Sequence, residues 1–252
     1  MPVTIPTQVP VYVRGFDGIP DNPDLPIGIQ IIAPTPREII DSEVIDLFLD
    51  LRNYSLGNKE EGGNAVHVIL DNQPPQKVYD IDRPLTFSNL AVGGHTIRVF
   101  AVRPDGTMFP DPASFDICHF FVKRKDFQNY VDPSLPYLTL NLPSDGIIDI
   151  DEEGAIVFDY FVHHANATNG FIVRYDLSGG YIGELKTQGP VYWRNLTPGK
   201  HRLKVDFLDR NGRMIPGPFN QVEREFIVRQ VIRAEPVVEE AEVIEDSPVL
   251  LP

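Results

Sequence analysis

The stretch PLTFSNLAVGGHTIRVFAVRPDGTMFPDPASFDICHFFV at residues 84–122 returns as PVYWRNLTPGKHRLKVDFLDRNGRMIPGPFNQVEREFIV at residues 190–228. The two stretches align without a gap at an offset of 106, and 12 of their 39 positions are identical. A repeat of this length indicates duplication of a whole domain rather than a short solenoid unit. Whatever the two stretches share therefore belongs to the scaffold of each copy.

The repeat extends upstream once small gaps are allowed. VHVILD at 66–71 matches FIVRYD at 171–176, and VIDLFLDLR at 44–52 matches AIVFDYFV at 155–162. These matches carry the duplication over most of each copy.

Each copy contains seven short runs rich in Val, Ile, Phe and Tyr, which alternate apolar and polar residues between Gly, Pro, Asn and Asp. No stretch keeps a 3.6-residue period, and the best helical candidate, 37–52, alternates equally well as a strand. Seven short strands with turns about every dozen residues favour a β-sandwich. The predicted strands lie near 28–33, 44–52, 65–70, 76–80, 85–89, 95–102 and 115–123, and near 137–142, 155–163, 170–176, 181–186, 190–195, 201–208 and 221–229.

The segments GGHTIRVFAVRPDG and PGKHRLKVDFLDRNG carry a Gly-x-His-x-Ile-x-Val and a Gly-x-His-x-Leu-x-Val pattern, each followed by a turn. The pattern resembles the late strands of bacterial immunoglobulin-like and fibronectin type III-like domains, whose turn reads Asp-x-x-Gly. The second copy keeps that turn at 209–212, whereas the first has Arg-Pro-Asp-Gly at 103–106. The resemblance covers about a third of each domain, and it implies a fold without implying a function.

The fold class expected from the repeat and the resemblance is all-β, with two tandem immunoglobulin-like β-sandwiches and extended N- and C-terminal arms. The expected parts are a Pro-rich arm at 1–27, a first sandwich at 28–126, a linker at 127–136, a second sandwich at 137–230 and an acidic tail at 231–252.

Composition excludes several classes of partner. The formal net charge of −14 repels phosphate backbones and anionic lipid surfaces, so we expect no nucleic acid and no membrane surface as partner. No apolar run reaches the roughly 18 to 20 residues of a membrane span, and the N-terminus lacks the pattern of a signal peptide. The single cysteine cannot form an intrachain disulfide, which favours a reducing, cytoplasmic compartment.

No catalytic residue and no cofactor is predicted. The chain has no Gly-x-Ser-x-Gly elbow and no Gly-rich phosphate loop, and Cys118 lies within a predicted strand. His95 and His201 stand at equivalent repeat positions, so we expect them to bond neighbouring backbone groups. His163 and His164 are adjacent on a strand and point to opposite faces, which does not suit one metal ion.

The acidic segment 149–154 is the best metal candidate. Asp149, Asp151 and Glu153 precede Gly154 in a spacing similar to part of a calcium loop. The twelve-residue pattern with its terminal Glu is absent, which favours the alternative of a solvated turn between strands.

Aromatic residues gather in the middle strands of the second copy. Tyr181, Tyr192 and Trp193 could form an exposed platform for a glycan. Phe87 matches Trp193 in the first copy, which favours a core position for Trp193 instead.

The two arms differ most from the repeated scaffold. Two interpretations of the arms are open. They are either disordered tails, or extended segments that add to sheet edges or lie in the groove of a neighbouring protein. The predicted partner-binding residues are Val11, Tyr12, Val13, Val249, Leu250 and Leu251. The hypothesis is a non-catalytic structural or accessory subunit that binds protein subunits of a larger complex, with no small-molecule substrate. The alternative is a cell-envelope binding module, with glycans as the ligand.

Overall fold

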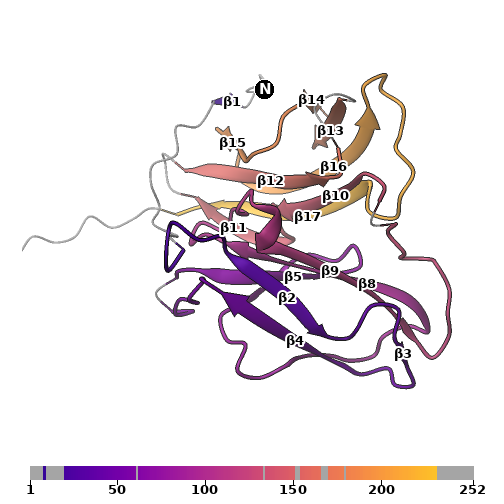
Figure 1. Ribbon diagram of the computed structural model, residues 1–252. Helices are drawn as coiled ribbons and strands as arrows, with labels where there is room; N and C mark the ends of the chain where they lie inside the picture. Colours follow the sequence, from indigo (N-terminus) through magenta and orange to yellow (C-terminus); the bar gives the residue numbers. More distant parts are fainter. Residues whose placement is uncertain are drawn as a thin grey trace, which may run out of the picture.

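The computed structural model describes residues 8–9, 20–60, 62–132, 134–150, 154–165, 170–178 and 180–231. In these residues the chain forms four β-sheets and a single turn of 3-10 helix (Figure 1). Within the same residues no helix is long and apolar enough to cross a membrane.

The first sandwich consists of a three-stranded sheet, β2-β4-β7, facing a five-stranded sheet, β3-β9-β8-β5-β6. The 3-10 turn, η1, lies just before the last strand. The elements are β2 (Gly28–Ala33), β3 (Ile39–Ile40), β4 (Ile45–Arg52), β5 (Ala65–Leu70), β6 (Gln76–Val78), β7 (Leu85–Phe87), β8 (Gly93–Val102), η1 (Pro112–Ser114) and β9 (Phe115–Val122).

The second sandwich repeats this plan, with sheets β1-β15-β12-β10 and β11-β17-β16-β13-β14. Its first sheet carries one extra strand, β1, which comes from the N-terminal end of the chain. The elements are β1 (Gln8–Val9), β10 (Tyr137–Leu142), β11 (Gly146–Ile150), β12 (Ala155–His163), β13 (Phe171–Leu177), β14 (Tyr181–Leu185), β15 (Val191–Arg194), β16 (Gly199–Asp209) and β17 (Gln221–Gln230). The chain is therefore two tandem immunoglobulin-like β-sandwiches, as the repeat predicts.

Each sandwich has its own apolar core, built from alternate residues of the facing strands. Leu203, Val205 and Phe207 point inward from β16, and Ile97, Val99 and Ala101 hold the same places in β8. Because successive side chains of a strand point to opposite faces, this alternation is enough to direct the apolar residues inward.

Strand pairing confirms one upstream match of the repeat and corrects the other. Ile45 pairs with Phe87 as Ile156 pairs with Trp193, which is the predicted alignment of β4 with β12. Val99 pairs with Val68, whereas its equivalent Val205 pairs with Tyr175. β5 and β13 therefore align at an offset of 107, and the predicted match of 66–71 with 171–176 was wrong by two residues. An alignment error of two residues leaves every side chain on the same face of its strand, because side chains alternate with a period of two. The apolar-polar alternation therefore could not reveal the error.

Two short edge strands were not predicted. β3 and β11 each run parallel to the last strand of their own sandwich. Asp149 and Ile150 belong to β11, so this part of the acidic segment is a strand and not a turn.

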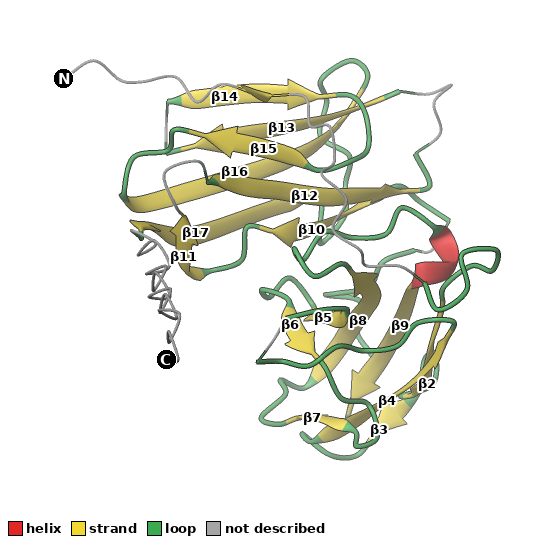
Figure 2. Cartoon of the chain, turned by 90° about the vertical axis from the view of Figure 1, so that its left-hand side faces the viewer, coloured by secondary structure: helices red, strands yellow, loops and turns green. Residues whose placement is uncertain are grey.

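The two sandwiches stack on one another (Figure 2), and the outer face of the β8 sheet meets the outer face of β10 and β12. Arg98 of β8 donates to the carbonyl of Leu138 at 3.1 Å, and its guanidinium lies 4.1 Å from the ring centre of Phe219. All ten residues of β8 are buried, while β16 keeps buried and more exposed residues in near alternation. The first copy thus buries a sheet face that the second copy leaves to solvent.

A chain of buried polar groups crosses this contact. His67 Nδ1 donates to Asn141 Oδ1 at 2.6 Å, and Asn141 Nδ2 donates to Asp159 Oδ2 at 2.6 Å. The backbone N–H of Met108 reaches the same Asp159 oxygen at 2.9 Å. Burial raises the pKa of Asp159 to about 7, although both hydrogen bonds favour its charged form. Burial lowers the pKa of His67 to about 4, so its ring is neutral at pH 7.

Candidate binding site at an edge of the first sandwich

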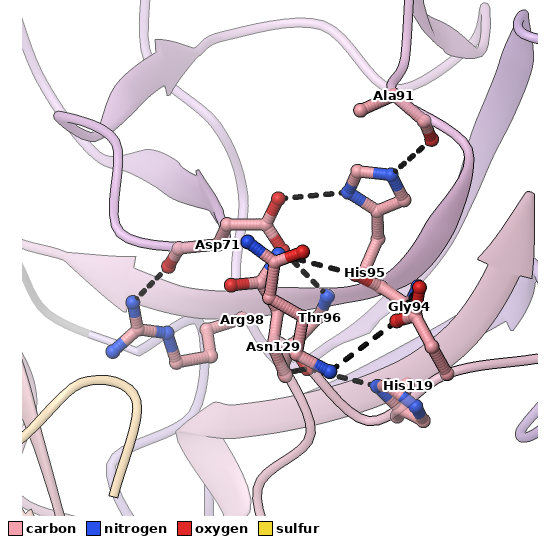
Figure 3. Close-up of polar contacts among 10 residues, drawn as sticks. Asp71, Ala91, Gly94, His95, Thr96, Arg98, His119 and Asn129 are labelled. Atoms are coloured by element: carbon pink, nitrogen blue, oxygen red, sulfur yellow. Dashed lines mark hydrogen bonds and ion pairs between the residues drawn. The ribbon is translucent and has the colours of Figure 1, made fainter.

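His95, at the start of β8, has an acceptor at each ring nitrogen. Its Nδ1 donates to Asp71 Oδ2 at 2.7 Å and its Nε2 donates to the carbonyl oxygen of Ala91 at 2.8 Å (Figure 3). Burial alone lowers the pKa of His95, but the hydrogen bonds to Asp71 and Ala91 outweigh it, so this pKa lies above its usual value. The geometry fits an imidazolium ring held by a carboxylate.

Asp71 also fixes the turn that follows β5. Its Oδ1 accepts the backbone N–H of Thr96 at 2.9 Å, and its carbonyl oxygen accepts a hydrogen bond from Arg98. Asp71 has a φ of 52°, a left-handed conformation that Asp and Asn tolerate better than most residues. One residue therefore supplies the turn, the partner of the imidazole and a link to the contact between the sandwiches.

The second copy keeps the histidine and lacks the carboxylate. His201 Nε2 donates to the carbonyl of Thr197 at 2.8 Å, as His95 does to Ala91. Its Nδ1 lies 2.8 Å from the hydroxyl of Ser178, which occupies the place of Asp71. A hydroxyl can donate as well as accept, so this pair does not require a second ring proton. The bond of each histidine to a backbone carbonyl agrees with its expected scaffold role, and the ion pair is specific to the first copy.

The segment after β9 closes one side of the site. Asp126 Oδ1 accepts the N–H of Gly94 at 2.7 Å, and Asn129 Nδ2 donates to the carbonyl of Gly94 at 3.1 Å. A Cβ atom at Gly94 would lie 2.7 Å from the carbonyl oxygen of Asp126, so no larger residue fits. The second copy has Lys200 at this position, and its Nζ lies 3.1 Å from Glu225 Oε2.

A pocket of about 510 Å³ opens beside this ion pair, at the edge of the sandwich where β6 and β7 end their sheets. Its volume falls in the range of small-ligand or peptide pockets. Asp71 and His95 border it on one side, and residues 86–92 form another wall. The remaining lining residues are Leu70, Gly94 and four residues with amide side chains, Gln73, Gln76, Gln128 and Asn129.

The lining of this pocket is suited to binding neutral polar groups. The His95 ring donates from both nitrogens, so it has no free lone pair with which to accept a proton from a substrate. The charges of Asp71 and His95 offset each other. Amide side chains offer donors and acceptors to neutral polar groups such as peptide bonds or hydroxyls.

The three aromatic residues predicted as a glycan platform do not share a surface. Trp193 is 2% exposed and stacks on Phe158 with ring centres 4.8 Å apart, so it belongs to the core. Tyr192 lines a separate pocket of about 320 Å³ between the sandwiches. Tyr181 is half-buried in the opposite sheet and packs against the core. Trp193 thus occupies the core position that its match to Phe87 favours, and the alternative of a platform fails because Tyr192 and Trp193 point to opposite faces of β15 while Tyr181 lies in the other sheet.

The metal candidates are only partly described. Both carboxylate oxygens of Asp149 accept hydrogen bonds from Arg229, at 2.6 and 2.7 Å, which lowers the pKa of Asp149. Asp151 and Glu153 lie outside the described residues. Asp149 is thus engaged with a neighbouring strand.

The predicted partner-binding residues of both arms lie outside the described residues. They are Val11, Tyr12, Val13, Val249, Leu250 and Leu251. One part of the N-terminal arm is described: Gln8–Val9 pairs antiparallel with β15, with Gln8 opposite Trp193 and Val9 opposite Tyr192.

Sequence reasoning did not find Asp71 as a site residue. The predicted alignment placed Asp71 opposite Asp176, so the two copies looked alike at this position. At the observed offset Asp71 stands opposite Ser178, and the difference is plain. The signal was present in the sequence but hidden by the two-residue slip.

No family model matches the chain, and no curated protein matches it in sequence. Among solved structures it is similar to fibronectin(III)-like modules of Clostridium thermocellum CbhA, with 14% identity and a TM-score of 0.30, over 80% of this chain and 94% of that one. It is also similar to three N-terminal domains of the highly immunogenic outer capsid protein of bacteriophage RB49, with 10% identity and a TM-score of 0.24, over 82% and 70%. Two tandem V-type regions of a v-region-containing chitin binding protein give 7% identity and a TM-score of 0.24, over 81% and 99%. These likenesses carry no argument about what this chain binds.

Proposed function

We propose that this chain is a non-catalytic structural or accessory subunit that binds protein partners of a larger assembly by adding extended segments to its sheet edges. The observation that carries the proposal is the pairing of Gln8–Val9 with β15. A segment far from β15 in sequence becomes the fourth strand of its sheet.

Strand addition suits a protein-binding role. The edge of a sheet presents unpaired backbone N–H and C=O groups, and an extended peptide satisfies them whatever its side chains are. Pro6 and Pro10 bracket the paired residues, and proline has no backbone N–H to donate. A strand this short forms few hydrogen bonds, so a partner segment can replace it at low cost.

The contact between the two sandwiches supports the role of a scaffold. Arg98 and the chain from His67 to Asp159 hold one sheet face against the other. Breaking such a contact would leave charged and polar groups without their hydrogen-bond partners, which is unfavourable. The contact therefore holds the two sandwiches together, and their sheet edges lie at a fixed spacing.

The alternative is a cell-envelope binding module with glycans as the ligand, and an exposed aromatic platform would support it. Trp193 is in the core, and no observation on the described residues favours a stacked sugar ring. The protein-binding proposal is therefore the one we develop.

Affinity purification from the native source tests the proposal, with the tagged full chain compared with a chain that lacks residues 1–19 and with Val9→Pro. We expect defined protein partners to co-purify with the full chain in near-stoichiometric amounts, and at least one to be lost from both variants. Unchanged recovery of every partner would refute the role of the arm. Recovery of no protein, together with specific signals on a glycan array, would favour the alternative.

A further inference from the structure

β7 and β15 are equivalent strands of the two copies. Thr86 and Phe87 stand at the repeat positions of Tyr192 and Trp193, at the offset of 106. β7 pairs with β4, and β15 pairs with the equivalent strand β12 in the same register. Ile45 lies opposite Phe87, and Ile156 lies opposite Trp193. A feature of one edge can therefore be compared directly with the other.

The outer edge of β15 carries an added strand, with Val9 opposite Tyr192 and Gln8 opposite Trp193. β7 is the last strand of its sheet, and among the described residues no strand pairs with its outer edge. Thr86 and Phe87, the two positions equivalent to those that β1 covers, line the 510 Å³ pocket. The two positions that β1 pairs with in the second copy thus border a pocket in the first copy.

The wall of the pocket indicates the chemistry of its occupant. Asp71 and His95 are the charged groups among its lining residues, and they neutralise each other. The amides of Gln73, Gln76 and Gln128, which also line the pocket, offer donors and acceptors. An extended segment without charge could pair with β7 through one side of its backbone and face these amides with its side chains or its other backbone groups.

We propose that the pocket beside β7 is a second strand-docking site, which receives an extended, uncharged segment of a partner protein. The proposal rests on the proposed function and names the class of its partner. The chain's own example of such a segment is Thr7-Gln8-Val9-Pro10. It has no charged residue, and its two central residues, Gln8–Val9, pair with β15. The proposal assigns the β7 edge to a segment of another chain.

Ala91 and Thr197 provide a matched pair of positions for the test. Both are exposed, both lie at the same repeat position, and each uses its backbone carbonyl to bind the histidine of its own copy. A substitution at either side chain leaves that carbonyl in place. Ala91 lines the pocket, so Ala91→Tyr fills it, and Thr197→Tyr makes the same change in the second copy.

The probe is a fluorescent peptide with the sequence of residues 4–13, added to the full-length chain, whose β15 edge is already paired. We expect one peptide to bind, with chemical-shift changes at the backbone amides of residues 85–92. Thermal unfolding of each variant serves as the control that its fold is intact. Ala91→Tyr should weaken binding at least tenfold, and Thr197→Tyr should leave it unchanged.

A second variant, Gln76→Ala, removes an exposed amide from the wall without adding bulk and should weaken binding severalfold. Binding that Ala91→Tyr does not reduce would overturn the proposal, as would a complete lack of binding. If partners still co-purify through the N-terminal arm in that case, this inference fails and the proposed function stands. If co-purification also fails, both are refuted.

Discussion

Arg98 and Lys204 stand at the same position of the two copies, yet Arg98 is 1% exposed under the ring of Phe219 while Lys204 lies on a partly exposed sheet face. The same contrast holds next to them, where Phe100 of β8 is replaced by Asp206 in β16. On the exposed face Lys204 lies 3.6 Å from Asp206, in one of several ion pairs. Duplication supplied one sheet twice, and only the first copy uses its outer face for the contact between sandwiches.

Arg98→Ala should therefore destabilise the protein far more than Lys204→Ala. The first change removes hydrogen bonds to Leu138 and Asp71 and leaves buried carbonyl groups without a donor. We expect a loss of about 3 kcal/mol in the free energy of unfolding for Arg98→Ala and less than about 0.5 kcal/mol for Lys204→Ala. Urea unfolding followed by fluorescence measures both, and equal losses would contradict the assignment of this face.

Much of the fold could be predicted because it depends on alternation and turns. In β16 and β17 apolar residues alternate with charged ones, and both strands are exposed on one face as that pattern indicates. In β9 the run ICHFFV has little alternation, which is the pattern of a strand covered on both faces. The comparison of the two copies could thus have predicted that the first sheet is covered, although not by which element.

The candidate site could not be predicted in the same way, because it depends on groups that are distant in sequence. Asp71, Ala91 and Asn129 meet only when a turn, a loop and the connecting segment converge on β8. The added strand β1 lies more than 180 residues before its partner β15, and nothing in the letters Gln-Val specifies that edge. Pairing of this kind is carried by backbone groups, which every sequence has.

Cys118 should not react with thiol reagents in the folded protein. Burial raises the pKa of its thiol to about 12, and the Sγ atom donates to the carbonyl of Pro34 at 3.2 Å. Because the thiolate is the reactive form, we expect reaction with a chromogenic disulfide only after unfolding in denaturant. Rapid stoichiometric reaction in native buffer would contradict this position of Cys118.

Asp159→Asn should change how stability depends on pH. Burial raises the folded-state pKa of Asp159 to about 7, above the usual value of 3.8, so between these values the folded state holds a proton that the unfolded state releases. Asp159 therefore contributes a stability that is lost as the pH rises from about 4 to about 7. Burial lowers the pKa of His67 to about 4. Its contribution to the free energy of unfolding therefore rises as the pH increases from about 4 to its usual pKa of 6.5, which is the opposite sign.

Asp159→Asn removes the contribution of Asp159, so the contribution of His67 to the pH dependence is no longer offset. Relative to the parent chain, Asp159→Asn should gain free energy of unfolding as the pH rises from 4 to 7, with a slope of at most about 1.4 kcal/mol per pH unit. Chemical unfolding at a series of pH values measures the difference. Parallel curves for the two proteins would show that Asp159 is ionised throughout.

Asp71→Ser gives the first copy the side chain that the second copy has, and it should return the His95 ring to a lower pKa. In the parent chain the bonds to Asp71 and Ala91 raise the pKa of His95 against the effect of burial, so this pair stabilises the fold most at low pH and loses that contribution as the pH rises through the folded-state pKa. With a hydroxyl in place of the carboxylate, burial is no longer outweighed. We expect the His95 resonances to titrate at lower pH than in the parent chain, by NMR, while the N–H bond to the Ala91 carbonyl persists. A His95 titration that Asp71→Ser leaves unmoved would show that the carboxylate does not hold the second ring proton, and the ion pair at the border of the pocket would then have to be abandoned.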